Sequence, residues 1–450
     1  MSATPEQLAQ PNKQQSDALP PISNRNKKAS PSGLKSVLSM LGPGLITGSS
    51  DDDPSGIAAY SQVGAQFGYS LLWTMVLSYP LMTAIQEVCA RIGRVTGCGI
   101  SANLRRHYPA SLSYSVVALV LVANVFNLGA DIGAMAATAQ LLLPAGASIY
   151  ILGFGLASLL LQIFVPYKKY AGYLKWLTLS LFAYIATAFF VHIDWHAALY
   201  ASVIPKISLS QSWLTGFIAV MGTTISPYLF FWQASQEVEE VRTTHGDKAL
   251  KRAPRQAPAQ FERIRMDTYI GMALSNIVAF FIILTTAATL HAHGETDVSS
   301  AAQAAKALAP LAGPWAAGIF ACGIIGTGLL AVPVLAGSAA YAIGEARNWP
   351  ASLERKPQNA VRFYLAIAAA TIAGIALNFF HIDPMRALYW AAVLNGMLAA
   401  PLMAVILHLA SSRKVMAEFA IPSYLRVMGW AATFVMLIAS IGMLVTWNQQ

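Results

Sequence analysis

Residues 46–56 read Ile-Thr-Gly-Ser-Ser-Asp-Asp-Asp-Pro-Ser-Gly and place three consecutive carboxylates in a stretch that is otherwise apolar enough to cross a membrane. An aspartate at the centre of a membrane helix costs roughly 2.5–3.5 kcal/mol on translocon-based scales, and a bound cation is the natural partner that offsets this cost. Asp51, Asp52 and Asp53 are therefore the first candidates for a functional site.

The helix that carries these acids is expected to break near mid-membrane. Pro54 disfavours helical backbone at the residue before it, and the Ser-Gly pair that follows tolerates irregular backbone. A second interruption, centred on Pro227, lies at 222–233 in Gly-Thr-Thr-Ile-Ser-Pro-Tyr-Leu-Phe-Phe-Trp-Gln. One proline could be an ordinary kink, but two breaks half a chain apart are typical of a secondary transporter with an inverted repeat, because unwound backbone at membrane depth lines a site.

The composition is that of a polytopic membrane protein. Hydrophobic residues make up 56% of the chain and charged residues 11%, and the mean hydropathy is +0.53. Apolar runs of about 20 residues predict about eleven membrane helices. We expect these helices near 36–66 (interrupted), 69–90, 112–141, 147–166, 173–193, 212–237 (interrupted), 268–291, 308–344, 363–380, 386–411 and 427–447.

The basic residues predict the orientation of the chain. If the N-terminus is cytoplasmic, all but three of the 29 Lys and Arg residues fall on the cytoplasmic side, and only Lys206, Lys306 and Arg386 are external. This agrees with the positive-inside rule and predicts a multi-pass protein of the cell inner (plasma) membrane with an external C-terminus. The net charge of +9 then reflects orientation, so we expect no nucleic-acid partner.

Several motifs resemble the first two helices of the natural resistance-associated macrophage protein (NRAMP) family of divalent-metal transporters. The resemblance continues more weakly through 222–233 and covers nearly all of 36–447. The motifs are Gly42-Pro43-Gly44, Asp53-Pro54-Ser55-Gly56, Gln66-Phe67-Gly68-Tyr69-Ser70-Leu71-Leu72-Trp73, Ala90-Arg91-Ile92-Gly93 and Val95-Thr96-Gly97.

The resemblance implies an all-α LeuT-type fold with a 5+5 inverted repeat and broken helices 1 and 6. A divalent metal would be imported by alternating access, bound between the two breaks, often with proton co-transport. We accordingly expect a disordered cytoplasmic tail at 1–35, the first repeat at 36–210, the second repeat at 211–412, and helix 11 at 413–450.

The chain departs from the usual family pattern at both breaks. The usual helix-1 motif is Asp-Pro-Gly-Asn, but here Ser55-Gly56 replaces Gly-Asn. The usual helix-6 motif is Met-Pro-His, but here the chain reads Ser226-Pro227-Tyr228. An amide oxygen, a thioether and an imidazole are thereby lost.

In helix 3, Asp131 occupies the place of an acid linked to proton movement, but Ala134 replaces the second acid, which puts the usual proton route in doubt.

The remaining candidate ligands are all oxygen atoms, which suit Mg²⁺, Ca²⁺ or Mn²⁺ better than the softer metals. The ion therefore stays open between Mg²⁺, as in the family's magnesium-transporting branch, and Mn²⁺ or Fe²⁺. The candidate ligand positions are Asp51, Asp52, Asp53, Ser226, the backbone around Ile225, and Asn395.

Other polar residues in the predicted helices are candidates for the proton or ion pathway, because intramembrane ionisable residues are usually functional. Glu87 could instead pair with Arg91, its i+4 neighbour, and asparagines also join helices by hydrogen bonds. The pathway candidates are Asp131, Glu87, Tyr228, Gln233 and Asn276.

An enzyme is not expected, because the chain lacks a nucleotide-binding loop, a His-Glu-x-x-His motif and a nucleophile elbow. The main alternative is a sodium- or proton-coupled transporter of another small solute on the same fold, although three aspartates in the break would repel an anionic substrate. We expect divalent metal ions and the lipid bilayer as partners, a monomer, and no cofactor besides the transported ion.

Overall fold

The computed structural model describes residues 48, 51–165, 178–380 and 382–447. The predicted tail at 1–35 and most of the first half of predicted helix 1 lie outside these residues. The unit that begins at Leu41 is compact and contains every described residue. Its α-helices are α3 (Pro54–Phe67), α4 (Trp73–Thr96), α5 (Ile100–His107), α6 (Ala110–Ala139), α7 (Ala147–Phe164), α9 (Phe182–Thr187), α10 (Trp195–Val203), α11 (Gln211–Thr224), α12 (Pro227–Thr243), α13 (Ala257–Thr289), α14 (Ala301–Lys306), α15 (Ala309–Ala312), α16 (Ala316–Ala346), α17 (Val361–Leu377), α18 (Pro384–Ser411), α19 (Arg413–Met416) and α20 (Ser423–Trp447).

Short 3₁₀ helices extend or connect these elements. They are η1 (Gly68–Leu71), η2 (Thr178–Leu181), η3 (Pro254–Gln256), η4 (His291–His293), η5 (Gly313–Trp315), η6 (Pro357–Asn359), η7 (Asn378–Phe380) and η8 (Ala417–Phe419).

Eight helical stretches in the described residues are long and apolar enough to span a membrane. They correspond to eight of the predicted helices, although α13 begins at Ala257, eleven residues before the predicted start. Three predicted helices are not among these eight stretches. The prediction 36–66 overlaps α3, 69–90 overlaps α4, and 173–193 overlaps η2 and α9. Because α4 carries Glu87, Arg91 and Arg94, it is less apolar than the eight, yet most of its residues are buried.

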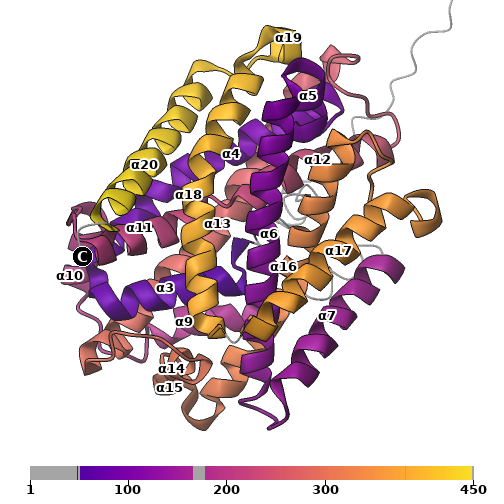
Figure 1. The fold of residues 1–450 in the computed structure, drawn as a ribbon. Coiled ribbons are helices and arrows are strands. Elements are labelled where there is room, and N and C mark those ends of the chain that lie inside the picture. Colours follow the sequence, from indigo (N-terminus) through magenta and orange to yellow (C-terminus); the bar gives the residue numbers. More distant parts are fainter. Residues whose placement is uncertain (1–47, 49–50, 166–177, 381, 448–450) are drawn as a thin grey trace, which may run out of the picture. The chain divides into compact units, whose positions relative to one another are not determined.

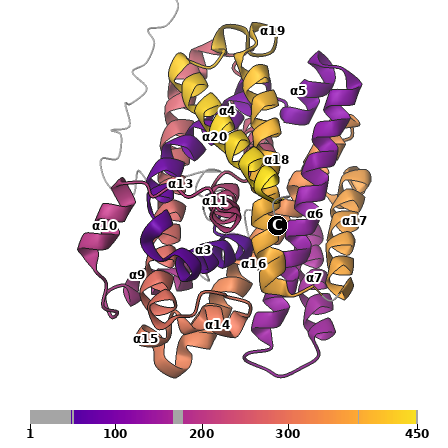
Figure 2. The same cartoon turned by 60° about the vertical axis from the view of Figure 1, so that its left-hand side comes forward.

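The two predicted breaks meet in the interior of this unit. Helix α3 packs against α13, α18 and α11, and the views in Figures 1 and 2 both place α11 beside α3. Helix α12 packs between α4 and α16, and every residue of α12 from Pro227 to Glu239 is buried. The fold therefore surrounds the irregular segments with long helices, which shield their free backbone groups from lipid.

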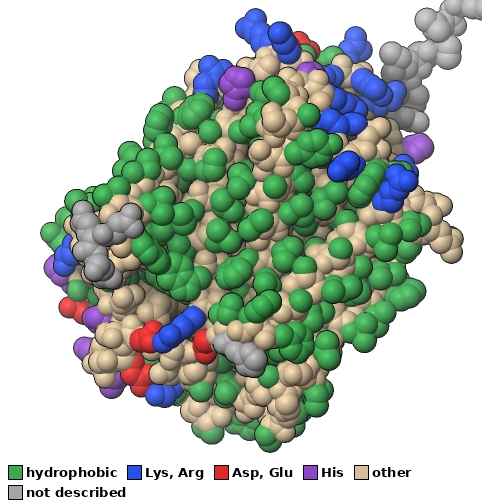
Figure 3. All heavy atoms as spheres, viewed as in Figure 1, with side chains coloured by type: hydrophobic (Ala, Val, Ile, Leu, Met, Phe, Trp, Pro, Cys, Tyr) green, Lys and Arg blue, Asp and Glu red, His purple; other side chains and the backbone are tan. Residues whose placement is uncertain are grey.

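The face drawn in Figure 3 separates apolar from charged side chains. Hydrophobic side chains cover the flank formed by the long helices, and most Lys and Arg side chains gather at the end where α5 and α19 lie. Most acidic side chains on this face lie toward the opposite end, near α14, whereas histidines lie at both ends. This is the pattern of a membrane protein whose apolar belt separates a basic face from a less basic one.

Candidate functional site

The first break lies between Asp51 and Pro54. The backbone is helical at Asp51, bends at Asp52, and is extended at Asp53, which has φ −72° and ψ 170°. Helix α3 then begins at Pro54, whose fixed φ suits the first helical position. All three aspartates are buried, so the predicted break with its carboxylates exists in the interior of the protein.

Asp53 caps α3 and also reaches the second broken helix. Its Oδ1 atom accepts hydrogen bonds from the Ser55 hydroxyl at 2.6 Å and from the Gly56 amide at 2.7 Å. Its Oδ2 atom accepts a hydrogen bond from the Tyr228 hydroxyl at 3.2 Å. Capping therefore uses only one carboxylate oxygen, and the other points to the first turn of α12, where a cation between the two breaks would bind.

Asp51 and Asp52 point to another helix. The hydroxyl of Ser275 on α13 lies 2.9 Å from Asp51 Oδ2 and 3.0 Å from Asp52 Oδ1. The second oxygen of Asp51, Oδ1, is buried and has no hydrogen-bond partner. Within the described part of the chain, no group of three His, Cys, Asp or Glu side chains is arranged to hold a metal ion. The three aspartates thus do not form a ready-made tricarboxylate cage.

The second break consists of Ile225 and Ser226, between the end of α11 and the start of α12. Ser226 is extended, with φ −76° and ψ 125°, and its hydroxyl lies 3.0 Å from the Gly222 carbonyl oxygen and 2.6 Å from that of Thr223. This hydroxyl closes the last turn of α11, and its lone pairs stay available to a cation. Both residues are buried.

Asn395 lies beside the second break. Helix α18 crosses α11 so closely at Gly222 that a Cβ atom there would overlap the Ala392 carbonyl and Gly396. Asn395 belongs to this contact segment, is 1% exposed, and has no hydrogen-bond partner for its Nδ2 atom. Its amide is therefore the one candidate ligand that α18 contributes.

Asp131 on α6 is brought close to Asp53. It is fully buried, neither of its carboxylate oxygens has a hydrogen-bond partner, and it lies within electrostatic range of the Asp53 carboxylate and near the backbone of Ser55. An unpaired buried carboxylate is unfavourable unless a proton or a cation compensates it. The arrangement therefore places a second acid next to the first break.

The remaining pathway candidates are spread over the molecule. Glu87 pairs with Arg91 at 2.7 Å and accepts a hydrogen bond from Tyr424 at 3.2 Å, so the structure contains the alternative ion pair. Asn276 joins helices, because its amide donates to the Met75 carbonyl at 2.9 Å and its oxygen accepts from Ser78 at 3.1 Å. Tyr228 lies at the site itself, and Gln233 is buried further along α12.

Sequence reasoning missed three residues that contact the breaks. Ser275 binds Asp51 and Asp52, and Thr223 donates a hydrogen bond to the hydroxyl of Tyr60 at 2.8 Å, which joins α11 to α3. Ser275 precedes Asn276 in a helix that is otherwise apolar there, so a search for adjacent polar pairs would have found it. Tyr60 and Thr223 carry no comparable signal, since such residues are common in membrane helices.

Comparisons with known proteins agree with this architecture. The profile of a family described as natural resistance-associated macrophage protein-like matches residues 44–446. The divalent metal cation transporter MntH of Klebsiella pneumoniae (strain 342) is 24% identical over 426 residues, which cover 91% of this chain and 94% of that protein.

Solved structures show the same fold. The Eremococcus coleocola manganese transporter, in complex with an aromatic bis-isothiourea substituted compound, matches with a TM-score of 0.69 and 18% identity, covering 93% of this chain and 90% of that one. Mhp1, a nucleobase-cation-symport-1 family transporter, matches with a TM-score of 0.57 and 12% identity, covering 90% and 93%. The predicted fold class, an all-α membrane protein of the LeuT type, is confirmed.

Proposed function

Because the chain belongs to the natural resistance-associated macrophage protein family, we propose that it imports divalent metal cations by alternating access, with the metal bound between the two breaks. It is a multi-pass membrane transporter and not an enzyme. The names of its relatives support the cargo, since one is a divalent metal cation transporter and another a manganese transporter.

The observation that carries the proposal is the position of the Asp53 carboxylate. One oxygen caps α3, and the other accepts a hydrogen bond from Tyr228 across the gap to α12. A hydroxyl donor occupies the place that a cation would take beside this oxygen. Asp131, which is buried without a hydrogen-bond partner, adds negative charge to the same region. Both features favour a cation over an anionic solute.

Oxygen atoms dominate the available ligands. Asp53, the Ser226 hydroxyl, the backbone at Ile225 and the Asn395 amide surround the breaks, and Asp51 and Asp52 extend the negative charge toward α13. Such a set suits Mg²⁺ and Mn²⁺, with Fe²⁺ next, and disfavours soft ions such as Cd²⁺. We propose that Mn²⁺ and Mg²⁺ are both substrates.

The orientation and the repeats belong to the same proposal. The basic end of the molecule, where α5 and α19 lie, would face the cytoplasm, as the positive-inside rule predicts. The two inverted repeats would comprise 36–210 and 211–412, with 413–450 as an added helix, in a monomer. The breaks before α3 and before α12 support this division, because each lies near the start of one repeat.

Uptake into dye-loaded proteoliposomes tests the function. We expect saturable Mn²⁺ influx that Mg²⁺ inhibits by competition, because both ions fit an all-oxygen site. Liposomes without protein are the control. Influx that rises linearly with Mn²⁺ concentration, or no influx at all, would contradict a carrier for divalent metals.

The substitution Ser226→Met tests the oxygen site. A thioether beside the ion should favour Cd²⁺ over Mg²⁺, and a change in discrimination of about 1–2 kcal/mol would shift the ratio of their half-maximal concentrations roughly 5- to 30-fold. The matched control is Ser440→Met, a buried serine on α20 away from both breaks. A ratio that is the same in wild type, Ser226→Met and the control would show that residue 226 does not face the ion.

Proton coupling should be weak or absent. Because Ala134 replaces the second helix-3 acid of the family, metal influx should acidify the liposome lumen little, as measured with a pH-sensitive dye and Mn²⁺ as substrate. Protein-free liposomes give the background leak. A strong Mn²⁺-dependent proton signal that disappears in Asp131→Asn would instead make Asp131 the coupling residue.

A further inference from the structure

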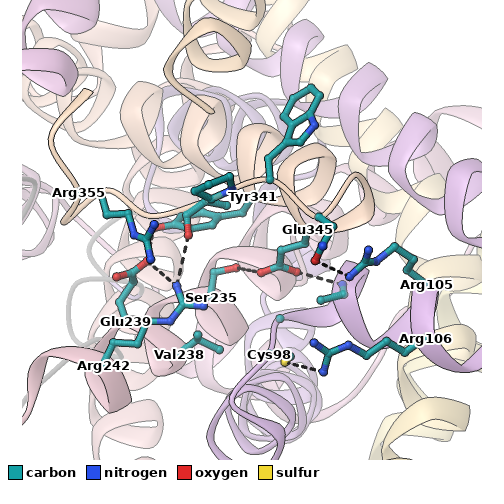
Figure 4. A pocket seen from close by; sticks show the side chains of 16 residues that line it. Cys98, Arg105, Arg106, Ser235, Val238, Glu239, Arg242, Tyr341, Glu345 and Arg355 are labelled. Atoms are coloured by element: carbon teal, nitrogen blue, oxygen red, sulfur yellow. Dashed lines mark hydrogen bonds and ion pairs between the residues drawn. The ribbon is translucent and has the colours of Figure 1, made fainter. Parts of the chain in front are cut away.

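A cavity of about 130 Å³ lies near the basic end of the molecule, between α5, α12, α16 and the segment that follows α16. Figure 4 shows that Glu239 and Ser235 reach it from α12, and that Tyr341 and Glu345 reach it from α16. Four arginines also line it, at positions 105, 106, 242 and 355. The function proposed above does not use any of these residues.

A row of hydrogen bonds joins α12 to α16 between the metal site and this cavity. The row begins at Tyr228, whose carbonyl accepts from Ser338 at 2.8 Å. Seven residues further along both helices, about 10 Å at the rise of an α-helix, the Ser235 hydroxyl donates to Glu345 at 3.2 Å. The same carboxylate accepts a backbone hydrogen bond from Ala102 on α5 at 3.3 Å.

The row continues to the segment after α16. Glu239 accepts hydrogen bonds from the Tyr341 hydroxyl at 3.2 Å and from the Ser352 hydroxyl at 2.9 Å. Tyr341 in turn accepts from the Leu353 amide at 3.1 Å, so this segment is tied to both helices. Glu239, Tyr341 and Ser352 are each at most 3% exposed.

Steric fit supports a specific contact rather than loose packing. A Cβ atom at position 99 would overlap the carboxylate of Glu345, so Gly99 lets that side chain reach the first turn of α5. The hydrogen bonds of Glu345 and Glu239 are to hydroxyls and an amide, and the one arginine that pairs with Glu239, Arg242 at 3.7 Å, is half exposed. Such bonds release a carboxylate to water more readily than a buried arginine would.

A second cavity lies on the other side of the first break from the row. A cavity of about 240 Å³ is lined by Ala58 and Gln62 of α3 and by Asp297 and Arg386. Ala58 lies one helical turn after Pro54, so this cavity approaches the first break. Cavities therefore lie at both ends, and the row of polar bonds crosses the one at the basic end.

We infer that the hydrogen bonds of Glu239 and Glu345 form the inner gate, which holds α12 against α16 and must open before a bound ion can leave toward the basic end. This inference rests on the proposed transport function, because it assigns the exit side of the same site. Breaking a bond of the row should raise the fraction of molecules in which α12 has separated from α16.

Cysteine labelling measures this opening directly. Val238 lines the cavity, is 4% exposed and makes no polar bond in the row, so Val238→Cys is a reporter that is covered while the gate is closed. Cys98 and Cys322 are replaced by serine, and Cys89 is kept because it is buried. The protein is placed in lipid nanodiscs, where both faces are accessible, and labelled with a hydrophilic maleimide.

Two tyrosines provide a matched comparison. Tyr341→Phe removes the bond to Glu239 and also the acceptor of the Leu353 amide. Tyr364→Phe removes hydroxyl bonds to the carbonyls of Leu353 and Arg355, in the same segment, without affecting α12. Since a single hydrogen bond contributes about 0.5–1.5 kcal/mol, we expect loss of the bond to Glu239 in Tyr341→Phe to speed labelling about 2- to 13-fold. Tyr364→Phe should label at the parent rate.

Ser352→Ala removes the second bond to Glu239 and should also speed labelling of Val238→Cys. This variant replaces Tyr341→Phe in the experiment if the purified Tyr341→Phe protein is not monodisperse. Equal labelling rates in the parent, Ser352→Ala and Tyr364→Phe would overturn the gate. Mn²⁺ uptake by the parent is measured separately. Its absence would contradict the proposed function, whereas unchanged labelling contradicts only the gate.

Discussion

Asp53→Asn should abolish Mn²⁺ uptake while leaving the fold intact. Asparagine is as good a helix cap as aspartate, so the bonds that Oδ1 accepts from Ser55 and Gly56 can persist. The substitution removes the negative charge that the ion would neutralise, and a carrier without its main anionic ligand should bind divalent metal weakly. The measurement is Mn²⁺ uptake into dye-loaded proteoliposomes, at a Mn²⁺ concentration that saturates the wild-type protein.

The matched control is Asp194→Asn. Asp194 caps α10 by accepting a hydrogen bond from the Ala197 amide at 3.0 Å, but it is exposed and lies outside the site. Its uptake should equal that of the wild type. If Asp53→Asn transports Mn²⁺ at the wild-type rate, Asp53 is only a helix cap.

We expect Asp51→Ala and Asp52→Ala to weaken apparent affinity without abolishing uptake, because their carboxylates point to Ser275.

Arg263→Ala should destabilise the protein more than other single changes of surface charge. Arg263 on α13 pairs with Glu237 on α12 at 2.5 Å, and the Glu237 side chain is fully buried. Removing the arginine leaves this carboxylate uncompensated in the interior, which typically costs about 3–5 kcal/mol. Thermal unfolding in lipid nanodiscs, monitored by tryptophan fluorescence, should show a large fall in the midpoint temperature.

An exposed ion pair provides the control. Lys306 and Glu295 lie 2.7 Å apart, but their side chains are 57% and 36% exposed, so Lys306→Ala should lower stability by no more than about 1 kcal/mol. Replacing both partners of the buried pair, as Glu237→Met with Arg263→Met, should recover part of the loss, because no charge is left unpaired. Equal midpoints for Arg263→Ala and Lys306→Ala would show that the Glu237 charge is compensated by other groups, such as Arg94.

The broken helices could be predicted from local sequence. Pro54 and Pro227 each sit at the first helical position of α3 and α12, and the residues before them are extended, as the steric effect of proline on its neighbour requires. Hydrophobic run length likewise predicted eight spanning stretches that the structure contains. These features depend on residues within a few positions of each other, so they can be read along the chain.

Helix ends were predicted less well. Helix α13 starts at Ala257, well before the apolar run that indicated it, because its first turns are polar and extend beyond the apolar part. Helix α4 carries Glu87 and Arg94 in buried positions, where the first pairs with Arg91 and the second with Asp247 at 2.6 Å. Hydropathy alone cannot show that such charges are compensated by partners.

The sequence by itself determined that the chain is a helical membrane protein with carboxylates at a break in an apolar helix, because proline geometry and hydrophobic length act locally. Only the tertiary structure decided which polar groups meet. It turned Asp53 toward Tyr228, Asp51 and Asp52 toward Ser275, and Glu239 toward Tyr341, all across sequence separations of more than 100 residues. Such contacts depend on how helices cross, which is set by packing of the whole helical unit and leaves no periodic signal in any one helix.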